Sequence, residues 1–239
     1  MREAGRVVEE VLLTVGNSIN VGVTTAMLNK IAEKKIRSYG ADPAFLGYNN
    51  FPASICASIN NEVVHGIPSL RRLQEGDIIS IDVGVCLKGY YGDAAATFAV
   101  GSISQEAQKL IEITKLSLQK AVEAMQVGNK LSDVSHAVQS CVERNSFSVV
   151  RNYVGHGIGE EMHEDPQVPN FGPPGRGPLL QPGIVLAIEP MVNAGSWEVE
   201  VLDDQWTVVT GDGSLSAHFE HTVALSDNGP EVLTSSSLS

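Results

Sequence analysis

The chain has 239 residues, 43% hydrophobic and 18% charged, so it can bury a globular core and is neither disordered nor a fibrous repeat. Its 16 basic and 28 acidic residues give a formal net charge of −12, the wrong sign for binding a nucleic acid backbone or an anionic membrane. Three cysteines are too few for a disulfide framework, and the first residues lack a secretory signal pattern. We therefore expect a cytoplasmic protein with no specific nucleic acid or membrane partner.

Two amphipathic helices are expected first, over 4–15 and 28–36, where apolar residues recur at helical spacing. From about residue 51 the pattern becomes extended, with a turn at Lys88-Gly89 between two strand-like runs. The extended runs are 55–59, 78–85 and 90–100. Two further helices are expected over 107–125 and 134–142, and the rest of the chain returns to strands and turns.

The order of helices and strands occurs twice, and the sequence itself contains a repeat. Residues 73–85 align with 180–192 at an offset of 107, and residues 22–32 align with 128–138 at an offset of 106. Two buried strands that each follow a glycine turn could be similar by chance. However, two separate pairs of segments align at offsets that differ by only one residue, which argues against chance. We therefore expect one domain over 1–239 with repeat-related halves at about 1–102 and 103–234, followed by a disordered serine-rich tail at 235–239.

Four acids stand in apolar runs that are typical of buried strands. Asp82 and Asp93 flank the Lys88-Gly89 turn, and their odd separation places both side chains on one face of a hairpin. Glu189 is the repeat partner of Asp82, and Glu220 is the fourth acid. Each acid alone is compatible with an ion pair, but basic residues in these strands are too few to pair all four, which favours a metal site.

Three histidines occur in distinctive turn contexts. His156 lies between two glycines, His163 precedes an acidic turn, and His65 precedes a Gly-Ile-Pro stop. A lone histidine in such a turn is more often structural than functional. A site rich in carboxylates with one histidine suits Mn, Fe or Co better than structural zinc, and two bridged ions are the usual hydrolytic arrangement. The sequence has no phosphate-loop lysine, no HExxH motif and no G-x-S-x-G motif.

Taken together, these segments resemble the type I methionine aminopeptidases of the short bacterial form, in metallopeptidase family M24. The resemblance covers essentially the whole chain and is carried by 51–56, 65–68, 76–82, 92–93, 155–159, 163–164, 188–191 and 220–222. It implies the pita-bread fold, an α/β (α+β) architecture in which two pseudo-twofold-related halves place their helices outside a curved antiparallel sheet. It also implies two divalent metal ions, which could be Co, Mn or Fe.

The resemblance further implies which residues form the site. The metal ligands matched by motif are Asp82, Asp93, His156, Glu189 and Glu220. The non-ligand catalytic histidines are His65 and His163, both of which also contact substrate, and Glu189 also acts as a catalytic residue. The positions of the methionine side-chain pocket are Phe45, Tyr48, Phe51, Cys56, Met162 and Trp206. Met162 departs from the aromatic residue often found before that histidine.

The hypothesis from sequence is a monomeric enzyme that removes the initiator methionine from nascent chains, with transient proximity to the ribosome and a preference for a small second residue. Asp82 and Glu220 would bridge the ions, and Glu189 would transfer the proton of water to the leaving amine. His163 would stabilise the oxyanion, and His65 would hold the substrate. A proline-specific aminopeptidase or dipeptidase of the same fold is one alternative, and a metal-free binding homologue is another.

Overall fold

The computed structural model describes residues 1–234, so the predicted tail at 235–239 lies outside the described residues. Four α-helices and fifteen strands are described, together with one short 3-10 helix, η1 (Tyr48–Asn50). The helices are α1 (Arg2–Gly16), α2 (Thr25–Ser38), α3 (Gln105–Ala124) and α4 (Leu131–Arg144). They match the four predicted helices. Thr24 caps α2, because its side chain accepts a hydrogen bond from the backbone of Met27. No helix of the described residues is long and apolar enough to cross a membrane.

The strands form four antiparallel sheets. The first contains β1 (Asp42–Pro43), β4 (Ile78–Leu87), β2 (Cys56–Ile59) and β5 (Tyr90–Ala99). The second contains β13 (Ser216–His218), β10 (Met191–Asn193) and β6 (Ser148–Val149), and the third contains β11 (Val199–Val201), β12 (Val208–Thr210) and β3 (Glu62–Val64). The fourth contains β15 (Gly229–Val232), β14 (His221–Ser226), β9 (Val185–Ile188), β7 (Gly155–Gly157) and β8 (Glu164–Val168).

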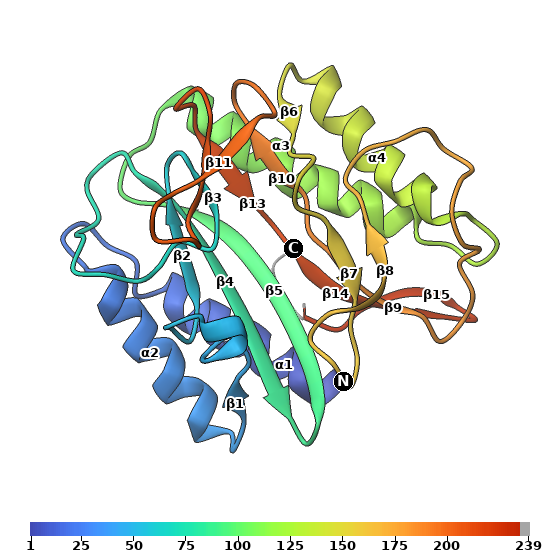
Figure 1. Ribbon diagram of the computed structural model, residues 1–239, viewed down its shortest axis with the longest axis horizontal. Coiled ribbons are helices and arrows are strands. Elements are labelled where there is room, and N and C mark those ends of the chain that lie inside the picture. Colours follow the sequence, from blue (N-terminus) through green and yellow to red (C-terminus); the bar gives the residue numbers. More distant parts are fainter. Residues whose placement is uncertain (235–239) are drawn as a thin grey trace.

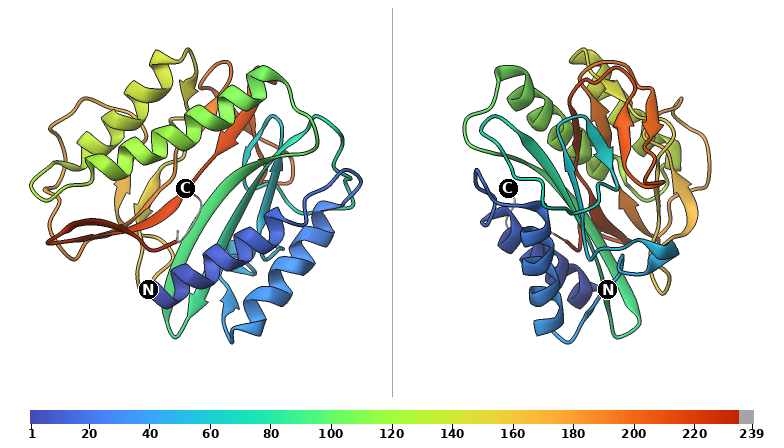
Figure 2. Two further views of the ribbon diagram at one scale, coloured as in Figure 1. Left: turned by 180° about the vertical axis from the view of Figure 1, so that it is seen from behind. Right: turned by 60° about the vertical axis from the view of Figure 1, so that its left-hand side comes forward.

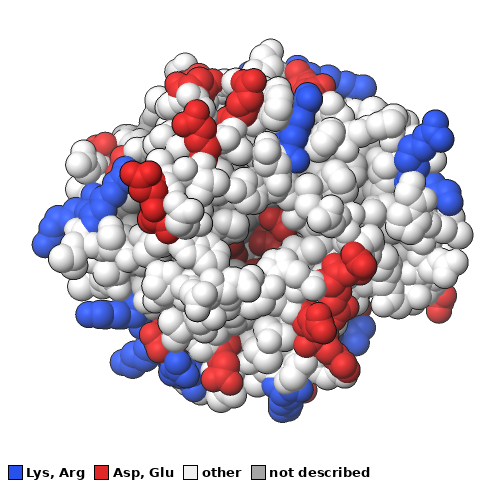
Figure 3. Space-filling model, viewed as in Figure 1, with Lys and Arg blue, Asp and Glu red and all other residues white. Residues whose placement is uncertain are grey.

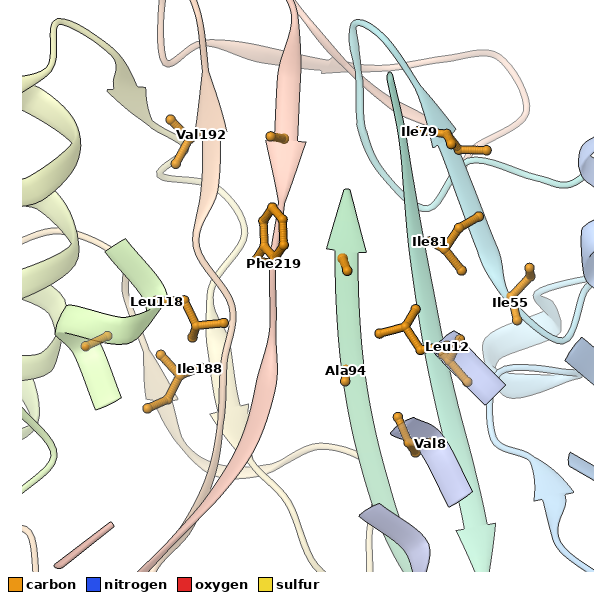
Figure 4. Packing of buried hydrophobic residues seen from close by; sticks show 14 of the residues in the cluster. Val8, Leu12, Ile55, Ile79, Ile81, Ala94, Leu118, Ile188, Val192 and Phe219 are labelled. Atoms are coloured by element: carbon orange, nitrogen blue, oxygen red, sulfur yellow. The ribbon is translucent and has the colours of Figure 1, made fainter. Parts of the chain in front are cut away.

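The helices lie together behind the strands. Seen from behind, α1 with α2 and α3 with α4 form two pairs that cover one side of the sheets, and the opposite side is open (Figure 1, Figure 2). The apolar core lies between these layers and is shared by both halves of the chain. In the close-up, Leu12 and Ile81 from the first half and Leu118 and Ile188 from the second belong to the same cluster (Figure 4). Burial of these side chains fixes the sheets on which the site is built.

The β4–β5 hairpin sets the positions of two predicted site acids. Lys88 and Gly89 are the two residues of its turn. Their φ values of 54° and 81° are both positive, as this type of two-residue hairpin turn requires. The resulting register pairs Asp82 with Ala95 and Gly84 with Asp93. The two carboxylates therefore lie diagonally on one face of the hairpin, as their spacing predicts.

The repeated segments occupy equivalent places in the fold. The backbone N–H of Gly22 donates to Leu73, and that of Gly128 donates to Leu180, both repeat-related pairs. Gly22 and Gly128 have φ values of 87° and 90°, a conformation that glycine adopts without strain. Isolated bridges join Thr24 to Arg72 and Lys130 to Leu179, again at the offsets of the sequence repeat. These contacts support the assignment of two related halves.

One difference between the halves lies beside a candidate ligand. The ten-residue strand β4 corresponds to two short strands, β9 and β10, which are separated by Glu189 and Pro190. Proline has no N–H to donate to a strand ladder, so the second copy cannot continue as one strand. The carbonyl oxygen of Pro190 accepts instead from the backbone of Phe219, and the interruption leaves Glu189 at the junction of two sheets.

The two halves meet along a seam between β5 and the segment around Glu220. The Glu220 N–H donates to the Ala95 carbonyl oxygen at 2.9 Å, and the Ala95 N–H donates back at 3.4 Å. Thr222 extends this seam, since its hydroxyl oxygen accepts from the Asp93 N–H at 2.9 Å and its hydroxyl lies 2.8 Å from the Asp93 carbonyl oxygen. Acids from different halves are thereby held next to one another.

Candidate active site

A hollow near the middle of the open face has acidic side chains at its bottom (Figure 3). It corresponds to a cavity of about 200 Å³ between the two halves. Its lining contains all five predicted metal ligands, both predicted catalytic histidines and five of the six predicted pocket residues. The lining residues are Phe45, Tyr48, Asn49, Phe51, Cys56, His65, Asp82, Asp93, His156, His163, Glu189, Trp206 and Glu220. Among the described residues, no lysine or arginine lines this cavity.

The candidate ligands come from separate strands and converge on one point. Asp93 lies on β5, His156 lies on β7, and Glu220 stands between β13 and β14. One ligand atom from each of these three residues lies within 4.8 Å of the others, a spacing that one cation can bridge. Asp82 and Glu189 lie outside this triad but line the same cavity, and Glu189 Oε1 is 3.6 Å from His156 Nε2.

Three buried oxygens of these acids have no hydrogen-bond partner in the described part of the chain. Asp82 Oδ1, Asp93 Oδ1 and Glu220 Oε1 are buried and have no hydrogen-bond partner among the described residues. Desolvation raises the pKa of Asp82 to about 7, and it raises the pKa values of Asp93, Glu189 and Glu220 well above those of ordinary carboxyl groups. Buried carboxylates of this kind need a cation to be stable in their charged form. The donor set of hard oxygens and one imidazole therefore fits divalent metal ions.

The glycines beside His156 are required by close backbone contacts. A Cβ on Gly155 would lie 2.3 Å from the Ala187 carbonyl oxygen, and one on Gly157 would lie 2.3 Å from the Asp165 carbonyl oxygen. The strand that carries His156 therefore packs tightly between its neighbours. His156 Nδ1 lies 2.8 Å from the Gly157 carbonyl oxygen, which leaves Nε2 as the nitrogen available to a metal ion. Burial lowers the pKa of His156 to about 4, so the ring is neutral, as a metal ligand must be.

The other two predicted histidines also line the cavity. The His163 ring is 4.3 Å from the His156 ring, and its Nδ1 is 2.7 Å from the Tyr48 hydroxyl. That contact fixes the direction in which Nε2 of the exposed His163 points. His65 has a positive φ of 61°, and its ring stands edge-on to Trp206 at 6.1 Å. Burial lowers the pKa of His65 to about 4.

An apolar wall adjoins the acidic cluster. Phe51 and Trp206 meet edge to face at 5.0 Å, and Cys56 lies beside Phe51 in a small buried cluster. Cys56 is also the direct cross-strand partner of Asp82, which places this apolar wall next to a candidate ligand. Met162, predicted from its motif position, is buried but does not line the cavity.

Two residues near the site were not identified from the sequence. Asn49 lines the cavity and has a φ of 47°, which its place in the η1 turn requires. His218 is buried with its Nε2 3.8 Å from Glu189 Oε2. Because alternate residues of an extended chain share a face, its position two residues before Glu220 was a signal that could have identified it.

Comparison with known proteins agrees with this geometry. Residues 1–227 match metallopeptidase family M24. The chain is 60% identical to a methionine aminopeptidase of Clostridium acetobutylicum, over 98% of this chain and 94% of that protein. It is 55% identical to methionine aminopeptidase 1 of Bacillus subtilis, with the same coverage of both chains. A crystal structure of the Rickettsia prowazekii methionine aminopeptidase superposes with a TM-score of 0.97 at 42% identity, covering 98% of this chain and 95% of that one.

More distant relatives share the fold alone. A prolidase from Pyrococcus furiosus superposes with a TM-score of 0.77 at 20% identity, over 99% of this chain and 63% of that one. The fold and the acid-lined cavity thus define a pita-bread metallopeptidase of family M24, and the predicted fold class is confirmed. Within that family, the chain belongs to the type I methionine aminopeptidases.

Proposed function

We propose that this protein removes the N-terminal methionine from newly made polypeptides that have a small second residue, using two divalent ions, which could be Co, Mn or Fe. The observation that carries the proposal is one cavity that combines unpartnered buried carboxylates with an aromatic and sulfur-containing wall. The carboxylates suit metal-assisted hydrolysis, and the wall suits a thioether side chain. The names of the relatives at 55–60% identity support the same activity.

Five residues would hold the ions. These are Asp82, Asp93, His156, Glu189 and Glu220, which all line the one cavity. When bound, two such ions lower the pKa of water so that hydroxide is available near neutral pH. The orphaned oxygens of Asp82, Asp93 and Glu220 are the atoms that support this arrangement.

The remaining polar residues would act directly on the peptide. Glu189 would accept a proton from water and deliver it to the leaving amine, because it lines the cavity beside the proposed ligand His156. His163 would donate a hydrogen bond to the oxyanion of the tetrahedral intermediate, with its ring oriented by Tyr48. His65 would hold the substrate chain near the scissile bond.

The size of the cavity supports removal of one residue at a time. Its volume of about 200 Å³ is below the ~300–1,000 Å³ of pockets for drug-sized ligands, so it suits a single side chain. The acidic cluster next to the wall would attract the free amino group of the first residue. We further propose that the chain acts as a monomeric, single catalytic domain in the cytoplasm with transient access to nascent chains at the ribosome.

A substitution at Glu220 tests this proposal. Glu220→Gln removes one charged ligand at nearly constant shape and should abolish hydrolysis of Met-Ala-Ser, whereas Glu200→Gln at an exposed position is the matched control. Metal content of both purified variants should be measured alongside activity. Full activity of a metal-loaded Glu220→Gln variant would contradict the ligand assignment.

Two measurements on the wild-type protein test the two alternatives, a proline-specific peptidase and a metal-free binding homologue. Faster cleavage of an Xaa-Pro peptide than of Met-Ala-Ser would favour a proline-specific enzyme. Absence of bound metal at any metal concentration would favour a non-catalytic homologue. A preference for Met-Ala-Ser with metal-dependent rates is the expected result.

A further inference from the structure

His218 is a buried imidazole beside Glu189 to which the proposed reaction assigns no role. It ends β13, where its Cα is paired with Met191 of β10. Its backbone N–H donates to Thr97 Oγ1 at 2.9 Å, and its carbonyl oxygen lies 2.9 Å from the same hydroxyl. Thr97 belongs to β5 in the other half of the chain, so contacts from both halves fix the position of His218.

The side chain of His218 has an unused polar atom. Only 2% of the residue is exposed, and its Nε2 is buried with no hydrogen-bond partner among the described residues. Glu189 Oε2 lies 3.8 Å from this nitrogen, and the other oxygen of the same carboxylate lies 3.6 Å from His156 Nε2. The Glu189 carboxylate therefore stands between two imidazoles, one in the proposed ligand set and one outside it.

The separation of 3.8 Å is too long for a hydrogen bond, but a small movement closes it. An N–H···O bond has a length of ~2.9 Å, so a shift of Glu189 by roughly 1 Å is sufficient. A buried N–H without an acceptor is unfavourable, and a carboxylate held by one oxygen has its second oxygen free to accept. Ligating carboxylates in metal sites are commonly held in this way by neighbouring donors.

We propose that His218 is a positioning residue, whose Nε2–H donates to Glu189 Oε2 and so turns Glu189 Oε1 toward the metal site. This inference rests on the proposed ligand and proton-transfer roles of Glu189. Without the donor, the carboxylate can rotate away from His156 and lose the geometry of both roles. The effect of His218 is therefore on metal binding and on turnover, with little effect on substrate affinity.

Two substitutions of His218 distinguish the effect of losing the hydrogen bond from the effect of losing side-chain packing. His218→Gln keeps an N–H donor on a side chain of similar reach, and His218→Leu removes the donor but keeps apolar volume. Each variant is first freed of metal with a chelator, and its affinity for manganese is then measured by titration calorimetry. The affinity should fall by about 10- to 100-fold in His218→Leu and recover in His218→Gln. The kcat for Met-Ala-Ser should follow the same order, with KM changed by less than about threefold. His218→Met is a second apolar replacement if the leucine variant does not fold.

A double mutant distinguishes positioning from a general structural role. If His218 acts through Glu189, His218→Leu should lower manganese affinity in the wild type but not in the Glu189→Gln background. Unchanged manganese affinity in His218→Leu, or equal losses in the leucine and glutamine variants, would overturn the inference. Failure of the wild type to cleave Met-Ala-Ser would instead overturn the proposed function, since manganese affinity is measured without substrate.

Discussion

Replacing Asp82 by asparagine should stabilise the metal-free protein, although it removes a proposed ligand. Asp82 is buried next to Asp93, and desolvation raises its pKa from 3.8 to about 7. The folded state holds this proton more tightly than the unfolded chain does. The free energy of unfolding of the metal-free protein therefore falls as pH rises from the ordinary pKa of 3.8 to the folded-state pKa of about 7. Asparagine does not ionise and avoids this loss.

The size of the effect follows from the displacement of the pKa. At pH 8, above both values, ionisation of Asp82 lowers the free energy of unfolding by about 4 kcal/mol, and at pH 5 by only about 1–2 kcal/mol. The advantage of Asp82→Asn over the metal-free wild type should therefore grow by about 2–3 kcal/mol between pH 5 and pH 8. Buried histidines titrate in both proteins and cancel in the difference.

Urea unfolding of the metal-free wild type and the metal-free Asp82→Asn variant at pH 5, 6, 7 and 8 measures the difference in their free energies of unfolding. Asp42→Asn is the control, because the side chain of Asp42 is 82% exposed and its removal should change stability by less than ~0.5 kcal/mol. Manganese at 100 times its Kd should then stabilise the wild type by ~2.7 kcal/mol and Asp82→Asn by less at that concentration. A difference between wild type and Asp82→Asn that is constant or shrinks from pH 5 to pH 8 would refute the reasoning.

Two further predictions concern substrate handling. Tyr48→Phe removes the hydroxyl that lies 2.7 Å from His163 Nδ1, and it should lower kcat/KM for Met-Ala-Ser by about 2- to 10-fold, the value of one hydrogen bond. Steady-state kinetics checks this, and an unchanged kcat/KM would exclude a role for Tyr48 in orienting His163. Gly84→Ala would place a Cβ 2.5 Å from the Phe45 ring, so the ring must move and KM should rise by about 3- to 10-fold with kcat nearly constant. A fall in kcat at constant KM would show that the substitution disturbs the catalytic groups instead.

Much of the fold was predictable because its signals are local. Helical periodicity located all four helices, and the Lys88-Gly89 turn fixed the register that brings Asp82 and Asp93 to one face. The short strands β6, β11 and β12 carry little periodicity of their own. β12 pairs with β3, more than a hundred residues earlier, so its place depends on packing between the halves and not on local sequence.

The site was predictable where an acid contradicts its apolar surroundings. This signal singled out Asp82, Glu189 and Glu220, because a charge in a buried strand needs a compensating partner. His218 is not an acid in an apolar run, so its one signal was its position two residues before Glu220, and its relation to Glu189 arises only when β10 and β13 pair. Met162 was assigned from its neighbour in sequence, but its side chain packs into the protein interior and not into the cavity.

The seam through the site bears on how such a protein could have arisen. The first half contributes only Asp82 and Asp93 to the five candidate ligands, and hydrogen bonds between Ala95 and Glu220 hold the acids of the second half against them. Two carboxylates alone would not make a two-ion centre. A one-half ancestor could have formed a comparable cluster only by pairing with a second copy of itself, with the cations as the bridge across the twofold axis. Gene fusion would then have freed one copy to add a histidine to its two acids and to break its strand at Pro190, giving the centre two unequal sides.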